Sequence, residues 1–252
     1  MALDNNNNSV IELKNIAKTF GTKEVLKDVN LSVLKGEHLV IVGGSGCGKS
    51  VLFKIITGIF PASSGGVFIN GFDVSKKNQN DRLKLGLSIG MLFQHSALFD
   101  SLSVMQNIVF PISVNTYLSK LEQTNLATKN LELVGLNASI LNLNPAELSG
   151  GMRKRVALAR LLTQNPQIML FDEPTTGLDP VMSATITNLI KTVSKYLNAT
   201  SITITHDMLS AKTLASRVAF VSNKTIAWQG SAGDILNPEN KLIYNFAQGL
   251  AV

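Results

Sequence analysis

The chain reads Gly43-Gly44-Ser45-Gly46-Cys47-Gly48-Lys49-Ser50 directly after the apolar run His38–Val42 and before a helix predicted for Ser50–Phe60. This stretch fits the pattern G-x-x-x-x-G-K-[ST] in a strand, loop and helix setting. The glycines let backbone N–H groups turn inward around phosphates, and the helix N-terminus adds a partial positive charge. We expect Lys49 to reach the β- and γ-phosphates of a nucleotide and Ser50 to ligate Mg²⁺. The stretch therefore predicts an NTPase, although kinases of small molecules, GTPases and helicases share it.

The composition permits one folded unit of the α/β class. The 252 residues, 45% of them hydrophobic, are enough to bury a core and leave room for an inserted subdomain. The single cysteine, Cys47, excludes an internal disulfide framework and is interpreted as filler within the loop. No apolar run approaches the roughly 18 residues that span a bilayer, so we expect membrane association only through a partner. Met1–Ser9 is polar and lacks the features of a secretion signal, which predicts a disordered tail for residues 1–9.

The net charge of +6 and the pI near 9.4 would permit attraction to nucleic acid or anionic lipid. The basic residues are scattered, however, and form no block of the DNA-binding kind. We therefore expect no nucleic-acid partner.

Hydrophobic patterning predicts alternating strands and helices after the first two strands. Strands are expected at Val10–Thr19, Val25–Leu34, His38–Val42, Val67–Ile69, Leu87–Phe93, Ile168–Phe171, Ser201–Thr205, Arg217–Ser222 and Ile226–Gln229. Further helices are expected at Pro180–Leu197 and Met208–Ala215, and helical periodicity dominates from Leu98 to about Leu148. This order predicts a largely parallel sheet covered on both faces, in one domain over residues 10–240, with a helical subdomain inserted at about 98–160 and a C-terminal tail at 241–252.

Two acids follow the apolar strand Ile168–Phe171. A buried strand would deliver Asp172 and Glu173 to the carboxyl edge of the sheet, where ligands of open α/β sheets bind. We expect Asp172 to hold Mg²⁺ through water and Glu173 to polarise the attacking water. A strand that ends in solvated acids is the plainer alternative, and the phosphate loop favours the catalytic interpretation.

Gln94 and His206 each follow a predicted strand and are expected at the same edge. A glutamine there can reach Mg²⁺ or the attacking water, and a histidine can hydrogen-bond the γ-phosphate. A lone histidine after a strand is more often a surface turn residue, which is the alternative for His206. His38 and His95 are interpreted as incidental.

A second anion site is predicted where Leu148-Ser149-Gly150-Gly151-Met152 precedes a helix that runs to about Leu162. At this point the chain resembles the ABC transporter ATPases over roughly residues 10 to 235. The resemblance includes the phosphate loop, Gln94, the LSGG segment, Asp172-Glu173, Gly177-Leu178-Asp179-Pro180 and His206, in the expected order.

That resemblance implies a P-loop NTPase core of the ABC type with an antiparallel β subdomain and an inserted α-helical subdomain. It further implies that Phe20 stacks on adenine and that Ser149, Gly150 and Gly151 cap the γ-phosphate of ATP bound to the other subunit of a homodimer. Asp179 would couple the two sites across the interface. Because Glu173 and His206 are both present, two hydrolytic sites are expected. Packing at a strand end is the alternative for Phe20.

A finer resemblance, to the Mla/MCE-associated lipid-transport ATPases, lies in residues 93–104 and in Met152-Arg153-Lys154-Arg155. It implies ATP-driven phospholipid transport through a permease, with an MCE-domain protein as a further partner, at the cytoplasmic face of the inner membrane. The Ala97 to Val104 stretch would face the groove for a permease helix, or pack in the helical core. The alternatives are the ATPase of a small polar solute importer and a soluble ABC ATPase without a permease.

Overall fold

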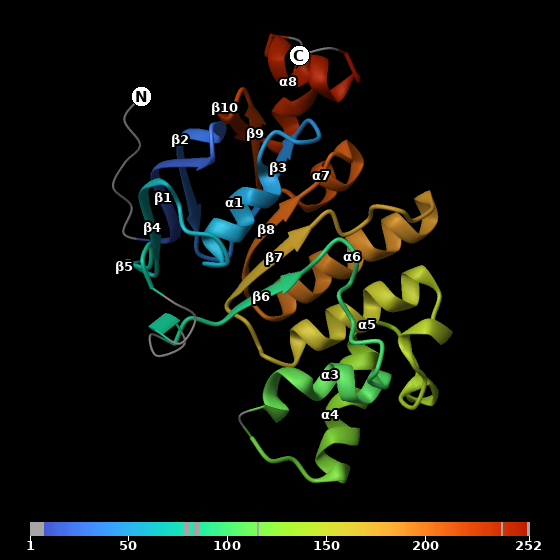
Figure 1. The fold of residues 1–252 in the computed structure, drawn as a ribbon. Coiled ribbons are helices and arrows are strands. Elements are labelled where there is room, and N and C mark those ends of the chain that lie inside the picture. Colours follow the sequence, from blue (N-terminus) through green and yellow to red (C-terminus); the bar gives the residue numbers. More distant parts are fainter. Residues whose placement is uncertain (1–7, 78–80, 83–85, 115, 238, 251–252) are drawn as a thin grey trace. The chain divides into compact units, whose positions relative to one another are not determined.

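The computed structural model describes residues 8–77, 81–82, 86–114, 116–237 and 239–250. The chain divides into two compact units, one formed by Met1–Leu87 with Ala199–Val252 and the other by Ser88–Asn198. Each unit is described by itself below (Figure 1).

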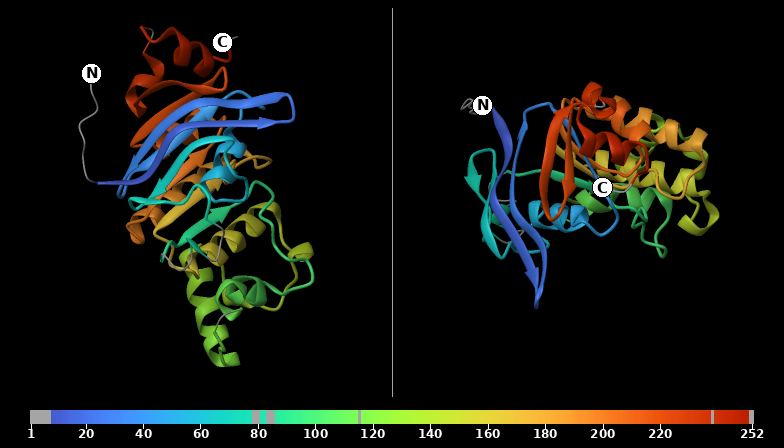
Figure 2. Two further views of the ribbon diagram at one scale, coloured as in Figure 1. Left: turned by 60° about the vertical axis from the view of Figure 1, so that its left-hand side comes forward. Right: turned by 90° about the horizontal axis from the view of Figure 1, so that it is seen from above.

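The first unit contains an antiparallel sheet with the strand order β2-β1-β4-β5. Its strands are β1 (Ser9–Phe20), β2 (Lys23–Leu34), β4 (Ser64–Ile69) and β5 (Phe72–Asp73). The long strands β1 and β2 run side by side as the blue hairpin in both views of Figure 2. Alternate apolar residues of this hairpin are buried, as expected for a sheet with one face on a core: Ile11, Leu13, Leu26, Val29, Leu31 and Val33.

Four more strands of the first unit follow the order β10-β9-β3-β8. They are β3 (His38–Gly43), β8 (Thr200–Ile204), β9 (Arg217–Ser222) and β10 (Thr225–Ser231). β3 is parallel to both β8 and β9, and β10 returns antiparallel to β9. Every residue of β3 and β8 is buried, which is typical of parallel strands covered on both faces.

The helices of this unit are α1 (Lys49–Ile56), α7 (Met208–Leu214) and α8 (Lys241–Ala247), with a 3₁₀ helix, η3, at Ala232–Leu236. The helix expected to reach Phe60 ends at Ile56, because Gly58 adopts a left-handed conformation at φ 77° that stops it. The segment expected as a C-terminal tail contains α8, whose Ile243 is buried and whose Phe246 ring lies 4.9 Å from that of Phe220. This helix therefore packs on its own unit.

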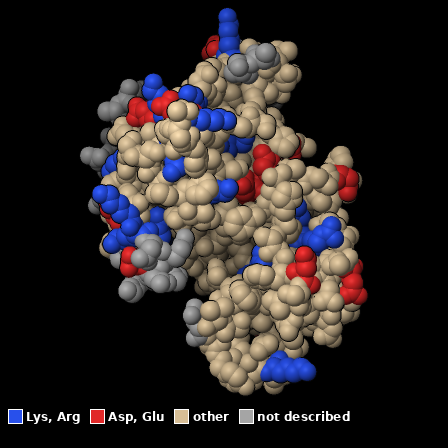
Figure 3. Space-filling view, in the orientation of Figure 1, with Lys and Arg blue, Asp and Glu red and all other residues tan. Residues whose placement is uncertain are grey.

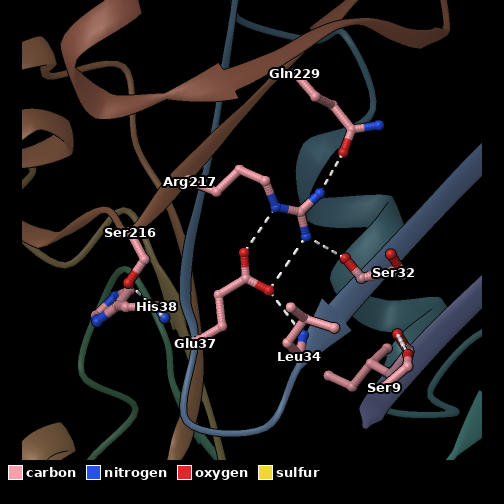
Figure 4. Close-up of polar contacts among 9 residues, drawn as sticks. Ser9, Ser32, Leu34, Glu37, His38, Ser216, Arg217 and Gln229 are labelled. Carbon is pink, nitrogen blue, oxygen red and sulfur yellow. Dashed lines mark hydrogen bonds and ion pairs between the residues drawn. The ribbon is translucent and has the colours of Figure 1, made fainter. Parts of the chain in front are cut away.

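A partly buried ion pair joins strands of the first unit (Figure 4). Arg217 on β9 donates through Nε to Glu37 Oε1 at 2.7 Å and through a terminal nitrogen to Gln229 Oε1 on β10 at 2.6 Å. Its other nitrogen donates to Glu37 Oε2 and to the carbonyl oxygen of Ser32 on β2. The guanidinium thus connects β2 of the antiparallel sheet to the strands beside the phosphate loop.

The second unit contains the parallel strand pair β6 (Ile89–Leu92) and β7 (Ile168–Asp172). Its helices are α3 (Val104–Ser113), α4 (Lys120–Leu133), α5 (Gly150–Leu162) and α6 (Pro180–Tyr196), with 3₁₀ helices η1 (Ala138–Ile140) and η2 (Pro145–Glu147). Helices α3, α4 and α5 pack on one another through buried apolar faces. α3 and α4 each begin with a capping box, so Gln106 accepts from the Ser103 N–H as an acid would at that position.

The α/β fold class with an antiparallel β part and helical insertions is confirmed. Residues 1–7 of the expected N-terminal tail lie outside the described residues, and Ser9 is the first residue of β1. The short strand β5, the 3₁₀ helix η3 and helix α8 were not predicted. Among the described residues, no helix combines the length and the apolar character needed to cross a membrane.

Candidate nucleotide-binding site

The phosphate loop leaves β3 at Gly43 and enters α1 at Lys49, and two of its glycines are required by space. A Cβ on Gly43 would lie 2.5 Å from the carbonyl oxygen of Val221, and a Cβ on Gly48 would lie 2.7 Å from Leu26 Cδ2. Gly48 also has φ 103°, which residues with a Cβ rarely adopt. The loop conformation therefore depends on glycine at both positions.

Lys49 folds back into this loop. Its Nζ donates to the carbonyl oxygens of Gly43 at 2.7 Å and Gly44 at 2.8 Å, and the side chain is buried. No side-chain hydrogen bond caps the N-terminus of α1. The same loop therefore faces the first-turn N–H groups of α1 and the ammonium group of Lys49. This arrangement binds phosphate.

Two other predicted residues lie in the first unit. The Thr205 N–H donates to the Ile41 carbonyl oxygen at 3.1 Å, so His206 leaves β8 beside the end of β3 from which the phosphate loop starts. Its imidazole is exposed. Phe20 is 42% exposed at the end of β1, with its ring centroid 5.5 Å from that of Phe60. The buried histidine is His38, whose Nε2 lies 2.8 Å from Thr203 Oγ1, and His95 is exposed.

The second unit carries the predicted carboxylates. Asp172 is the last residue of β7 and is buried, and Glu173 follows it with a left-handed backbone at φ 47°. Thr176 Oγ1 donates to Glu173 Oε2 at 3.2 Å. A left-handed backbone is disfavoured for glutamate, and such strain gathers at functional sites where the surroundings impose it. The backbone of Glu173 therefore supports a chemical role more than a solvated strand end.

Gln94 lies at the same edge of this unit as the carboxylates. β6 pairs in parallel with β7 through Leu92 and Phe171, so the residues after both strands emerge at one end. The carbonyl oxygen of Gln94 accepts a hydrogen bond from Nζ of Lys154 on α5. Burial lowers the pKa of Lys154, and the nearby Glu173 carboxylate acts in the opposite direction. Lys154 thus lies close to both Gln94 and Glu173.

The interpretation of the sequence assigned no role to Lys154. It occupies a position on α5 between the buried residues Gly151 and Leu158, three before and four after it. A lysine within the apolar stripe of a helix is expected to be buried, so helical periodicity could have identified Lys154 as a candidate site residue.

Within the second unit, Ser149-Gly150-Gly151 (the Ser149 segment) lies close to the start of α6, where Asp179 is the N-cap. Ser149 is the N-cap of α5, and its Oγ accepts from the Met152 N–H at 3.3 Å. A Cβ on Gly151 would lie 2.7 Å from Met182 Sδ on α6, so the two helices approach each other closely here. Asp179 caps α6 by accepting from the Met182 N–H at 2.9 Å. The first turns of α5 and α6 are thereby fixed to each other.

The expected metal donors are all oxygen atoms, namely the Ser50 hydroxyl, the Gln94 amide and the Asp172 carboxylate. Mg²⁺ prefers oxygen ligands and usually keeps several waters and substrate phosphates in its coordination shell. Among the described residues, no group of three or more His, Cys, Asp or Glu side chains could hold a metal by itself. This donor set therefore fits a magnesium ion that arrives with a nucleotide.

Comparisons with known proteins find similar sequences and structures. The family model described as "ABC transporter" matches residues 26–176. The intermembrane phospholipid transport ATP-binding protein MlaF of Haemophilus influenzae is 34% identical over 243 residues, 96% of this chain and 92% of that protein. The chloroplast protein TRIGALACTOSYLDIACYLGLYCEROL 3 of Arabidopsis thaliana is 35% identical over 263 residues, 98% of this chain and 76% of that protein.

A third relative, the probable ABC transporter ATP-binding protein PEB1C of Campylobacter jejuni, is 38% identical over 233 residues, 92% of this chain and 95% of that protein. Among solved structures, the dimeric ATP-binding cassette MJ0796 bound to ADP and Pi superposes with a TM-score of 0.80. It is 30% identical and covers 88% of this chain and 98% of that one.

Proposed function

The chain belongs to the ABC transporter family as an ATP-hydrolysing subunit, and on this premise we propose that it powers phospholipid movement through a membrane permease. The observation that carries the proposal is its likeness, over nearly the full length of both chains, to a protein named for intermembrane phospholipid transport. The Arabidopsis relative, which bears the name of a galactolipid, supports a lipid substrate as well.

In the proposed reaction, the phosphate loop from Gly43 to Ser50 holds ATP, and Phe20 stacks on its adenine. Mg²⁺, held by Ser50, Gln94 and, through water, Asp172, would supply neutralisation of phosphate charge. Glu173 accepts a proton from the attacking water and orients it toward the γ-phosphorus. Lys49 and His206 stabilise the charge that develops on the phosphate oxygens.

A second copy of the chain completes each site in this proposal. Ser149 is an N-cap whose oxygen accepts from the backbone, so its proton can be donated to a phosphate oxygen of the facing copy. Gly150 and Gly151 add backbone N–H groups at the start of α5. Asp179 caps α6 through the Met182 N–H, and the Met182 side chain lies close to Gly151, which supports the proposal that Asp179 relates one site to the other. The dimeric state of the solved relative supports this assembly.

The permease is proposed to bind at a cavity of about 480 Å³ in the second unit. Its lining includes Phe93, Ala97, Phe99, Phe110 and Pro111. The three phenylalanines are each at least 37% exposed, and the Phe99 and Phe110 ring centroids lie 4.6 Å apart. These residues are therefore an open apolar surface, which suits an inserted helix better than the alternative of core packing for Phe99.

The subunit would thus lie at the cytoplasmic face of the inner membrane and attach through the permease, with an MCE-domain lipid-binding protein in the same complex. On the face drawn in Figure 3, Lys and Arg occupy several separate groups, some of them beside acidic side chains. This distribution supports the expectation that no nucleic acid binds here.

The test is to purify the tagged chain from native membranes in mild detergent and to identify the proteins and lipids that accompany it by mass spectrometry. We expect a multi-spanning permease, an MCE-domain protein and bound phospholipid. A Phe99→Glu variant should lose these partners and keep ATP binding, whereas Tyr117→Glu, at a residue 94% exposed and outside the cavity lining, should keep both.

Other outcomes would replace the proposal. A permease that accompanies a soluble solute receptor would establish the importer of a small polar solute. An absence of any membrane partner would leave an ABC ATPase that acts without a permease.

A further inference from the structure

Two basic side chains of α5 bind the backbone that follows β6. Lys154 Nζ donates to the carbonyl oxygen of Gln94. Arg160, nearly two turns further along the helix, donates to the carbonyl oxygens of Ser96 at 2.9 Å and Ala97 at 2.7 Å. Three of the four carbonyls from Gln94 to Ala97 are therefore held by one helix, and the N-terminus of that helix is the Ser149-Gly150-Gly151 segment.

The backbone held by Arg160 has a disfavoured conformation. Ser96 and Ala97 are both left-handed, at φ 62° and 46°, although neither is glycine. Two successive residues of this kind need support from their surroundings. The planar guanidinium gives it by donating to both carbonyls, while its carbon lies 5.8 Å from the centre of the Phe99 ring.

The burial of Lys154 and the partial burial of Arg160 argue for a positioning role. Lys154 is only 6% exposed, and burial lowers the pKa values of both Lys154 and Arg160. A buried cation is costly compared with an apolar side chain of similar size, and its advantage is a directed hydrogen bond. Here the bonds are directed at the backbone of Gln94, Ser96 and Ala97.

A third buried side chain fixes the rest of the segment. Asn107 on α3 is fully buried; its Oδ1 accepts from the Phe99 N–H at 2.8 Å, and its Nδ2 donates to the carbonyl oxygens of Phe99 and Leu102 at 3.0 Å. The backbone from Gln94 to Ser103 is thus held from α5 at one end and from α3 at the other.

We propose that Lys154 and Arg160 are positioning residues that tie Gln94 and the apolar cavity to α5, so that cavity, Gln94 and Ser149 segment move as one body. The inference rests on the proposed function, because it assumes that Gln94 serves the metal and the water. Arg160 lines the cavity while it holds Ser96 and Ala97. A helix that enters the cavity therefore acts on α5 directly, and Lys154 carries the same displacement to Gln94.

The test compares ATP hydrolysis by the purified full chain in Lys154→Met, Lys154→Arg and the control Lys129→Met, which removes an exposed ammonium group from α4. For Lys154→Met we expect kcat to fall and the half-saturating Mg²⁺ concentration to rise, each by about tenfold, as for other groups that orient a metal ligand. The KM for ATP should stay within about twofold, because the phosphate loop is untouched. Lys154→Arg should recover most of the loss, since it keeps a buried donor.

Arg160→Met supplies a structural readout by amide hydrogen exchange. We expect faster exchange confined to residues 94–99, while Lys129→Met leaves those amides unchanged. If Lys154→Met does not fold, Lys154→Gln, which keeps a shorter donor, takes its place with the same expectations.

Gln94→Ala separates this inference from the proposed function. If Gln94→Ala raises the magnesium requirement and Lys154→Met behaves like the Lys129→Met control, the positioning role is wrong and the function of Gln94 stands. If Gln94→Ala itself leaves the magnesium requirement unchanged, the proposed role of Gln94 is wrong.

Discussion

The phosphate loop and the segment from Gln94 to Ser103 are both irregular backbone that follows a parallel strand, yet they are shaped by different means. The loop is held by its own Lys49, which donates to carbonyls five and six residues earlier, and its glycines Gly43 and Gly48 fit closely against the neighbouring strands β9 and β2. The segment is shaped by side chains elsewhere, and its partners on α5 lie 60 to 64 residues further along the chain.

This difference has a functional consequence. A loop that fixes its own conformation can bind phosphate whatever the neighbouring helices do. A segment held from α3 and α5 changes when those helices move, so it can report on a permease or on a facing subunit. We therefore expect changes that strain the phosphate loop to affect nucleotide binding and changes that loosen the segment to affect hydrolysis.

The largest separation of binding from hydrolysis is expected for Glu173→Gln. The substitution keeps the shape of the side chain but removes the base, so phosphate release should fall by about a hundredfold or more while ATP binding is retained. Size-exclusion chromatography with ATP should show a persistent dimer. The control is Glu132→Gln, at an exposed position on α4. Normal turnover by Glu173→Gln would exclude Glu173 as the base.

The converse effect, a loss of ATP binding, is expected for Gly48→Ala in the phosphate loop. A Cβ there would lie 2.7 Å from Leu26 Cδ2 and 3.1 Å from the Val25 carbonyl oxygen, on a backbone with φ 103°. Strain of this kind costs about 1–3 kcal/mol of unfolding free energy, and we expect ATP affinity to fall by about tenfold. Thermal unfolding and equilibrium nucleotide binding measure the two effects.

Gly44→Ala is the matched control for stability. A Cβ at Gly44 meets nothing within 4 Å, so its unfolding temperature should stay near that of the parent chain. Equal destabilisation by the two substitutions would contradict the view that space at Gly48 shapes the loop.

The same contrast explains what the sequence predicted and what it did not. The phosphate loop, the positions of most strands and the acids after β7 were predictable because glycine spacing and apolar runs are local patterns. Lys154 and Arg160 were not assigned roles. The apolar stripe of α5 marks Lys154 as a candidate buried residue, but no local pattern identifies the distant carbonyl oxygens that either side chain binds. The end of α1 was placed too late for a related reason, since the left-handed conformation of Gly58 is a choice that glycine permits without requiring.

A substitution at Asn107 on α3 can weaken the hydrogen bonds that hold the segment from Gln94 to Ser103. Asn107→Leu keeps the volume but removes the partner of the Phe99 N–H and of the Leu102 carbonyl oxygen, both partly buried, so we expect a loss of about 2–4 kcal/mol in unfolding free energy. Urea denaturation measures it. Asn125→Leu, an exposed position on α4, should stay within about 0.5 kcal/mol of the parent chain. If the two variants unfold alike, Asn107 does not hold the segment.

The smallest expected effect is a change in one pKa value. It tests whether the start of helix α4, which packs on α3 and α5, is fixed by its own N-cap. Hydrogen bonds from the Ser119 hydroxyl and backbone N–H lower the pKa of Glu122 below its ordinary value of 4.5. Because the folded pKa is depressed, this contribution to stability is present above the ordinary value and is lost as the pH falls through the folded one. Ser119→Ala should move the Glu122 pKa back toward 4.5 in a carboxyl NMR titration, whereas Ser139→Ala, at an exposed serine on η1, should leave it in place. If the Glu122 pKa does not respond to Ser119→Ala, the start of α4 is not fixed by its own cap. Its packing on α3 and α5 would then fix it, as side chains of α3 and α5 fix the segment from Gln94 to Ser103.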